Sequence, residues 1–293
     1  MINRNAAAAI CLDKRGAFPI VIMESNDDAI SQGNPMKKKA DPYFSTSLEK
    51  GLNILNLFNP SRPSVGLTEI SRLVGLNKTS AFRYANTLIR LGYLKKDPRT
   101  KLLSLSTQVL LLCNQTLMSF DLRKVVASVL DEIHDTHHMT VDSAVLQGNK
   151  LVKLYSRHAK DTLAFTLPLV CEALNCSALG KAILSRLPDK EMLDFVRHLP
   201  LVPKTDKSIV DRETLVADLR KARVRGFSVN NEEYVRGLFA LGAPLMNLEK
   251  ERPIGAISFD FASSEHSLKA VERDFSKLIV DVAAQISRSM PIV

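Results

Sequence analysis

Two helical patterns joined by only a short Gly-Leu turn restrict the fold of this chain more than any other feature of its sequence. Thr68 is a plausible N-cap for the first helix, and Gly75 ends it, as glycine often does just past a helix C-terminus. Asn77 is a candidate N-cap for the second helix, which runs to about Leu91 and is ended by Gly92. Two helices joined this tightly form a helix-turn-helix. Their apolar faces are expected to comprise Leu67, Ile70, Leu73 and Val74 in the first helix, and Ala81, Ala85, Leu88, Ile89 and Leu91 in the second.

The segments on either side complete a small domain. Before the helix pair, residues 47–58 place Leu48, Leu52 and Leu55 at helical spacing, and Asn59-Pro60 ends that helix. After the pair, residues 93–105 have the pattern of a strand, a turn and a second strand. We therefore predict that residues 43–105 form a winged helix-turn-helix, a module that places its second helix in the major groove of DNA.

That second helix is divided between a polar start and an apolar remainder. A recognition helix contacts base edges with its N-terminal residues, and its exposed N–H groups can hold a phosphate. Arg83 is the best candidate for a bidentate contact to guanine, and the basic hairpin residues suit phosphates or, for Arg99, the minor groove. The alternative is a three-helix bundle that contacts only other proteins. The candidate DNA contacts are Thr68, Lys78, Thr79, Ser80, Arg83, Tyr84, Lys95, Lys96, Arg99 and Lys101.

The net charge of +9 is concentrated in this part of the chain. Residues 37–101 hold thirteen Lys or Arg and four Asp or Glu, whereas the remaining segments together are neutral. A basic block beside a neutral remainder favours a polyanion-binding module attached to a domain with another role. A well-solvated basic face is the alternative.

The rest of the chain is expected to form a linker helix, residues 106–120, and a second domain, residues 121–293. Strands and helices interleave there without a strict βαβ rhythm, which favours an antiparallel sheet with flanking helices, so the fold class is α+β. The expected strands are 139–147, 150–157, 161–169, 227–234, 238–247 and 253–261, and the expected helices begin near 122, 175–177, 189, 212 and 265.

Several features limit the function classes. Residues 1–42 are expected to be a disordered extension, with Met36 as an alternative start. No apolar run approaches the roughly 18 residues that a membrane span needs, and the four cysteines show no CxxC pair. A cytoplasmic protein with reduced thiols is the expectation.

Three features raise the question of metal binding or catalysis. His134, His137 and His138 have a spacing that can place two imidazoles on one metal, but this spacing is more often a polar helix face. Cys176, at a helix start, could be an activated nucleophile, yet no partner histidine stands at a recognisable spacing. Glu232-Glu233 is expected to shape a loop, with side chains facing solvent. We expect no enzyme activity, no metal and no cofactor.

Three stretches resemble the IclR (isocitrate lyase regulator) family of transcription factors. They are "GLNKTSAFRYANTLIRLGYLKKDPRTKLLSLS", "EALNCSALGKAILS" and "GFSVNNEEYVRGLFALGAPLMN" followed by "PIGAISF", within residues 46–290. The resemblance implies a winged helix-turn-helix, a linker helix and a C-terminal GAF-like domain. It also implies dimers or tetramers on palindromic DNA operators and a small organic effector, often a carboxylate.

Carried onto this sequence, the resemblance predicts an effector pocket in the second domain. Peptide N–H groups near a helix N-terminus can bind a carboxylate, and nearby leucines and a phenylalanine can form an apolar wall. The predicted lining is the 175–180 helix start with Ala178 and Leu179, then Leu163, Phe165, Leu167, Asn230, Leu238, Ala240, Ser258 and Asp260.

Three residues depart from the family pattern. Asn175 stands where a histidine is frequent, Asn230 where an acid is common, and Asp260 where a small polar residue is common. An ionised Asp260 would repel a carboxylate, so either the ligand differs or Asp260 turns outward. The predicted function is a sequence-specific DNA-binding regulator controlled by a small organic acid. The alternative is an enzyme or metal-binding protein whose basic N-terminal domain mediates protein contacts.

Overall fold

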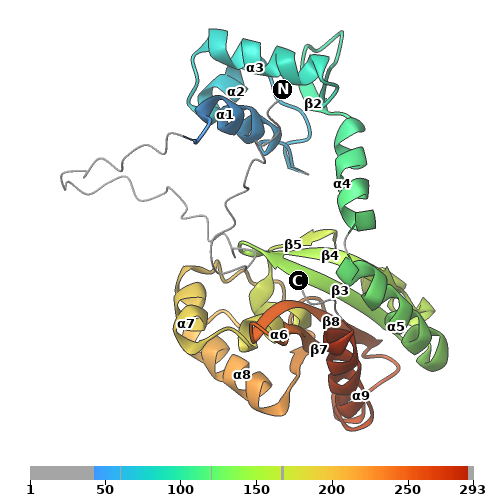
Figure 1. Cartoon of the computed structure of the whole chain (residues 1–293). Coiled ribbons are helices and arrows are strands. Elements are labelled where there is room, and N and C mark those ends of the chain that lie inside the picture. The colour runs from blue at the N-terminus through green and yellow to red at the C-terminus, as the bar shows by residue number, and fades with distance from the viewer. Residues whose placement is uncertain (1–42, 60, 120, 166–167, 290–293) are drawn as a thin grey trace, which may run out of the picture. The chain divides into compact units, whose positions relative to one another are not determined.

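The computed structural model describes residues 43–59, 61–119, 121–165 and 168–289, and only the backbone of 116–119, 121 and 163–165. The chain divides into two compact units, with the division after Phe120 (Figure 1). The expected N-terminal extension lies outside the described residues, and the other domain limits stay predictions. Within the described ranges, no helix is both long and apolar enough to cross a membrane.

The first unit is a winged helix-turn-helix followed by a further helix (Figure 1). Its core forms where the three N-terminal helices and the hairpin meet, and it consists of Ile54, Val65, Ile70, Ala81, Ala85, Leu88, Leu94 and Leu103. The elements are α1 (Thr46–Leu55), α2 (Leu67–Val74), α3 (Lys78–Arg90), β1 (Leu94–Lys96), β2 (Leu103–Leu105) and α4 (Gln108–Ser119).

Local hydrogen bonds fix the turn between α2 and α3. Gly75 ends α2 with φ of 68°, which favours glycine, and the Ser71 hydroxyl donates to the carbonyl of Leu76 at 2.6 Å. Asn77 then caps α3, because its Oδ1 accepts from the N–H of Ser80 at 2.8 Å. The predicted turn and this predicted cap are confirmed.

The predicted N-cap at Thr68 is wrong. Gly66 occupies the N-cap position with an extended backbone, and the helix begins at Leu67, which packs against the core. Thr68 is instead an exposed residue of the first turn of α2.

Three leucines expected to face inward lie on the surface. Leu48, Leu52 and Leu91 are 64%, 50% and 59% exposed, whereas Ile54 is the buried residue of α1. Helical spacing identifies residues that share a face, but not which face has a neighbour to cover it.

The second unit is built on a six-stranded antiparallel sheet in the order β5-β4-β3-β8-β7-β6 (Figure 1). One of its two central strands, β8, therefore lies between two strands that precede it in the chain. The strands are β3 (Thr140–Gln147), β4 (Lys150–Arg157), β5 (Val170–Cys171), β6 (Ser228–Asn231), β7 (Leu238–Asn247) and β8 (Arg252–Ala262).

Helices cover both faces of this sheet. Helices α5 and α9 pack on one face, and α6 lies on the other with α7 and α8 beside it (Figure 1). The helices are α5 (Asp121–His137), α6 (Ala178–Ser185), α7 (Asp189–His198), α8 (Arg212–Arg225) and α9 (Leu268–Arg288), with short 3₁₀ turns η1 (Lys160–Phe165) and η2 (Leu174–Cys176). The expected antiparallel sheet with flanking helices is confirmed.

The predicted strand at 161–169 is wrong. Residues Lys160–Phe165 form the 3₁₀ turn η1, and the strand that pairs with β4 is Val170–Cys171, preceded by Leu169, whose carbonyl accepts from the N–H of Lys153 at 2.8 Å. Side-chain bonds explain the turn: the Thr140 hydroxyl accepts from the N–H of Ala159 at 2.8 Å and bonds to the hydroxyl of Thr162. These contacts hold the segment against the start of β3.

Candidate functional site

The first turns of α3 present polar side chains to solvent. Lys78, Thr79 and Arg83 are exposed, while Ser80 is half-buried and donates its N–H to Asn77. On the opposite side of the same helix, Ala81 and Ala85 are buried in the core. The structure therefore shows the division between a polar start and an apolar remainder. Tyr84 is partly buried and packs against the core.

The hairpin that follows carries exposed basic residues on a well-ordered turn. Asp97 Oδ1 accepts from the N–H groups of Thr100 at 2.6 Å and Arg99 at 2.9 Å. The hydrogen bonds from Thr100 hold the pKa of Asp97 below its usual value. Lys95, Lys96 and Arg99 are exposed, whereas Lys101 donates its Nζ to the carbonyl of Pro98 at 2.6 Å.

In the second unit, seven of the predicted effector-site residues surround one small pocket. Its empty volume is about 240 Å³, which includes solvent at its mouth. Ser177, which belongs to the predicted 175–180 helix start, also lines it, and so does Tyr234, which was not predicted. The predicted residues around the pocket are Ala178, Leu179, Asn230, Leu238, Ala240, Ser258 and Asp260.

Close packing positions the start of α6 at this pocket. Ser177 caps the helix, since its hydroxyl accepts from the N–H of Gly180 at 3.2 Å. Ala178 and Leu179 are in the first turn, where peptide N–H groups have no acceptor within the helix. A Cβ on Gly242 of β7 would stand 2.4 Å from the Ala178 carbonyl oxygen, so only glycine allows this approach. The Ser228 hydroxyl donates to the same oxygen at 2.6 Å.

Asn230 shapes the loop at the other side of the pocket. Its Oδ1 accepts from the N–H groups of Glu233 at 2.8 Å and Tyr234 at 3.4 Å. An acidic side chain can accept the same bonds, so the departure from the family pattern at Asn230 preserves this role.

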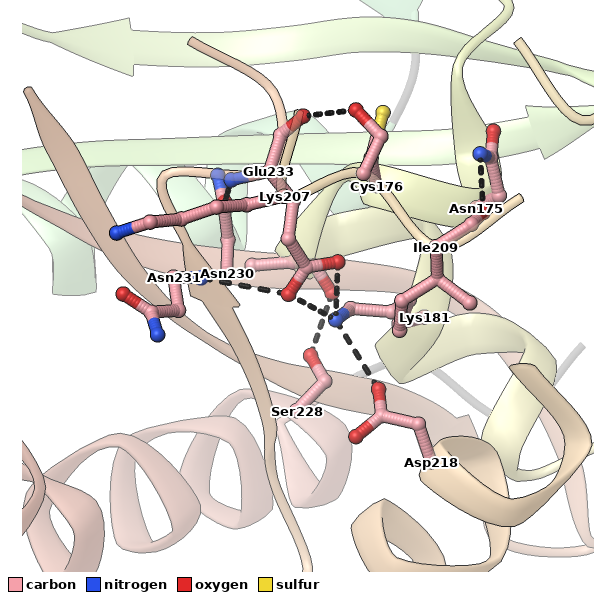
Figure 2. Close-up of polar contacts among 12 residues, drawn as sticks. Asn175, Cys176, Lys181, Lys207, Ile209, Asp218, Ser228, Asn230, Asn231 and Glu233 are labelled. Carbon is pink, nitrogen blue, oxygen red and sulfur yellow. Dashed lines mark hydrogen bonds and ion pairs between the residues drawn. The ribbon is translucent and has the colours of Figure 1, made fainter. Parts of the chain in front are cut away.

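A buried ion cluster holds this loop to α6 (Figure 2). Lys181 Nζ lies 2.7 and 2.8 Å from the two carboxylate oxygens of Glu233 and 3.0 Å from Asp218 Oδ2 on α8. The side chain of Lys181 is only 1% exposed. Burial raises the pKa of Glu233, and the charge of Lys181 opposes that rise. The expectation that Glu233 faces solvent is wrong, because its carboxylate is buried in contact with the ammonium group of Lys181.

Two further carboxyl groups lie on the sheet face beneath the pocket. Asp142 pairs in register with Ser258 and Thr140 with Asp260, so Asp142 and Asp260 are diagonal neighbours on one face. Both residues are buried, at 1% and 4% exposure. Of the two alternatives left open for Asp260, the outward orientation is wrong, since Asp260 lines the pocket.

Three predicted wall residues cannot be placed at the pocket. The side chains of Leu163 and Phe165 and all of Leu167 lie outside the described residues. Asn175 is described but points elsewhere, since its Nδ2 donates to the carbonyls of Ile209 at 2.8 Å and Val202 at 3.3 Å.

The possible metal and nucleophile clusters have other contacts. His134 Nδ1 lies 2.8 Å from the carbonyl oxygen of Met139, and the ring of His137 packs edge-on against Phe275. In the described parts of the chain, no group of three His, Cys, Asp or Glu could hold a metal. Burial, with the charge of Glu233, raises the pKa of the Cys176 thiol to about 12, so it is not a thiolate at neutral pH.

Both units match family models. Residues 114–288 match the C-terminal domain of the bacterial transcriptional regulator IclR, and residues 47–98 match the IclR helix-turn-helix domain. The chain belongs to the IclR family of transcriptional regulators. This membership accounts for both the exposed polar start of α3 and the pocket beside α6.

Known relatives cover most of the chain. The Pca regulon regulatory protein of Pseudomonas putida is 28% identical over 207 residues, which are 70% of this chain and 70% of that protein. An IclR family regulator from Brucella abortus has the same fold, with a TM-score of 0.72 at 22% identity over 88% of this chain and 97% of that one. An IclR homolog from Microbacterium hydrocarbonoxydans, solved in complex with 4-hydroxybenzoate, has a TM-score of 0.64 at 17% identity over 83% and 98%.

Proposed function

We propose that this regulator binds a palindromic DNA operator through α3 and the β1–β2 hairpin, as a homodimer or tetramer. We further propose that a small organic acid bound beside α6 controls this binding. The single observation that carries the proposal is the exposed polar start of α3, where Lys78, Thr79 and Arg83 face solvent on a helix whose opposite side is buried in the core of the unit.

The pocket supports the second half of the proposal. The first-turn N–H groups of Ala178 and Leu179 and the positive end of the α6 dipole favour an anion. The 4-hydroxybenzoate bound by the Microbacterium relative is also an organic acid. An effector that binds the DNA-bound and DNA-free states with different affinity changes operator affinity by the same factor.

Selection of bound duplexes from a random pool tests the DNA half directly. We expect the wild-type protein to enrich a sequence with two-fold symmetry, and Arg83→Ala to lose preference at specific positions of it. Enrichment of no sequence by the wild type would contradict the proposal. Titration of organic acids against the enriched duplex, followed by fluorescence anisotropy, then tests the effector half, since an effector shifts the DNA titration and an unrelated acid does not.

A further inference from the structure

Asp142 and Asp260 share one face of the sheet but have different surroundings. Asp142 Oδ1 accepts from the Ser156 hydroxyl and lies 3.8 Å from Lys153 Nζ. His158 Nε2 lies 2.9 Å from the same Ser156 hydroxyl, so one lysine and one histidine are grouped around Asp142. Burial raises the pKa of Asp142, and the hydrogen bond from Ser156 and the charge of Lys153 oppose that rise.

Asp260 has no such contacts among the residues that the structure describes. Its Oδ1 is buried and makes no hydrogen bond within those residues, and neither does the hydroxyl oxygen of the adjacent Ser258. Both residues line the pocket. A buried polar atom without a hydrogen-bond partner costs roughly 1–3 kcal/mol of free energy. A ligand group in the pocket that bonds to these two atoms is therefore favoured.

Asp142 and Asp260 together can carry one negative charge at low free-energy cost, but not two. Two carboxylates on one buried face repel each other, and Lys153, whose charge lowers the pKa of both Asp142 and Asp260, supplies only a single positive charge. Burial and the charge of Asp142 raise the pKa of Asp260 well above its usual value. Asp260 is accordingly the protonated member, and a neutral carboxyl both donates and accepts one hydrogen bond.

We propose that the pocket is built for a hydroxy acid, whose carboxylate meets the N–H groups of Ala178 and Leu179 and whose hydroxyl meets Asp260 and Ser258. This inference rests on the proposed function, in which an organic acid binds in the same pocket. A hydroxyl matches a neutral carboxyl because each can donate to and accept from the other. An acid without a hydroxyl leaves the Asp260 and Ser258 oxygens unpartnered and buried.

Matched pairs of acids test the inference by isothermal titration calorimetry and thermal shift on the full chain. The pairs are lactate with propionate, 3-hydroxybutyrate with butyrate, and 4-hydroxybenzoate with benzoate; alanine is added as the ammonium analogue of lactate. We expect the hydroxy member of at least one pair to bind about 10- to 100-fold more tightly than its partner.

Two substitutions at Asp260 separate the possible roles. Asp260→Asn keeps one donor and one acceptor without charge, so we expect it to retain the preference for the hydroxy acid. Asp260→Leu is close in shape and apolar, so we expect it to bring the two acids of a pair within about threefold of each other. Asp281→Asn, on the exposed surface of α9, is the control and should behave as wild type.

The outcomes are distinct. Equal binding of both members of every pair would overturn the hydroxy-acid inference and leave the proposed function standing. Tight binding of alanine that Asp260→Asn abolishes would also overturn it, because the pocket would then hold an ammonium group on an ionised carboxylate. If no acid binds while DNA binding is intact, both this inference and the effector half of the proposed function fail. The melting temperatures of the unliganded variants show that each is folded.

Discussion

Lys181 Nζ lies 2.7 Å from Glu233 Oε1 in the interior of the second unit, where the lysine side chain is 1% exposed. The same nitrogen contacts Asp218 on α8, so one cation joins α6, α8 and the loop after β6. Asn230 at the end of β6 accepts hydrogen bonds from that loop, and both Asn230 and Tyr234 of the loop line the pocket. The ion cluster therefore connects the stability of the unit to the shape of the pocket.

Lys181→Met should destabilise the protein by about 3–5 kcal/mol, because it leaves the buried carboxyl of Glu233 without its cation. The double variant Lys181→Met with Glu233→Met should recover most of this loss, since an apolar pair of similar volume can replace a buried ion pair. Chemical denaturation monitored by circular dichroism measures both. Lys221→Met, at an exposed position of α8, is the control; a loss in Lys181→Met no larger than in this control would show that the cluster adds nothing.

Arg83→Ala should cost about 1–3 kcal/mol in binding to the selected operator and should relax base preference. Arg90 is an exposed residue of the same type at the far end of the same helix, so Arg90→Ala is a matched control. Fluorescence anisotropy with operator and scrambled duplexes measures the difference. Equal effects of the two substitutions would mean that the start of α3 does not contact bases.

Lys96→Ala should weaken operator and unrelated DNA to the same extent. The exposed ammonium group lies on the hairpin, where a phosphate contact carries no sequence information. Loss of one such contact reduces the slope of log affinity against log salt by about one. Anisotropy titrations across a salt series measure the slope, and an unchanged slope would remove Lys96 from the interface.

Asp260 should make stability depend on pH in a defined direction. Because burial and Asp142 raise its pKa in the folded protein, the folded state holds a proton that the unfolded state releases above about pH 4. The free energy of unfolding therefore falls as pH rises from there toward the folded-state pKa, whereas an asparagine imposes no such fall. We expect the melting temperature of Asp260→Asn to rise relative to that of wild type as the pH increases above about 4. A difference that is constant with pH would contradict an uncharged Asp260.

Alkylation should distinguish the cysteines. Cys113 is exposed, whereas Cys171 and Cys176 are buried, and the pKa of Cys176 is raised to about 12. Because the thiolate is the reactive form, iodoacetamide at neutral pH should modify Cys113 and spare Cys176 in the folded protein. Mass spectrometry of peptides locates the label. Rapid stoichiometric labelling of Cys176 would restore the interpretation of that residue as a nucleophile.

The ends of several helices could be predicted from single residues, because those residues determine the local backbone geometry. Gly75 and Gly226 end their helices with positive φ angles, and Asn77 caps α3, because each of these positions has few acceptable residue types. The polar start of α3 was also predictable, since Lys78 and Arg83 stand apart from the apolar spacing of the same helix. Thr68 shows the limit of this kind of prediction, because glycine is also an acceptable N-cap and Gly66 occupies the position instead.

Long-range pairs could not be predicted in the same way. Lys181 stands in "ALGKAILS", where local spacing gives no reason to bury a lysine, and its partner Glu233 is 52 residues away. Asp142 lies in a predicted strand, but the sequence pattern does not say which residues pair with that strand. The register with β8 shows this. The prediction of a strand at 161–169 was wrong for the same reason. The hydrogen bond from the N–H of Ala159 to the Thr140 hydroxyl joins residues that are 19 apart.

The position of β8 between β3 and β7 has a consequence for how the protein is made. Chains fold from the N-terminus during synthesis, so residues 43–105 leave the ribosome and can fold long before residues 252–262 exist. Ser258 and Asp260 complete the pocket only after β8 inserts between two strands that are already present. A nascent chain thus acquires its helix-turn-helix early and the pocket beside α6 almost last.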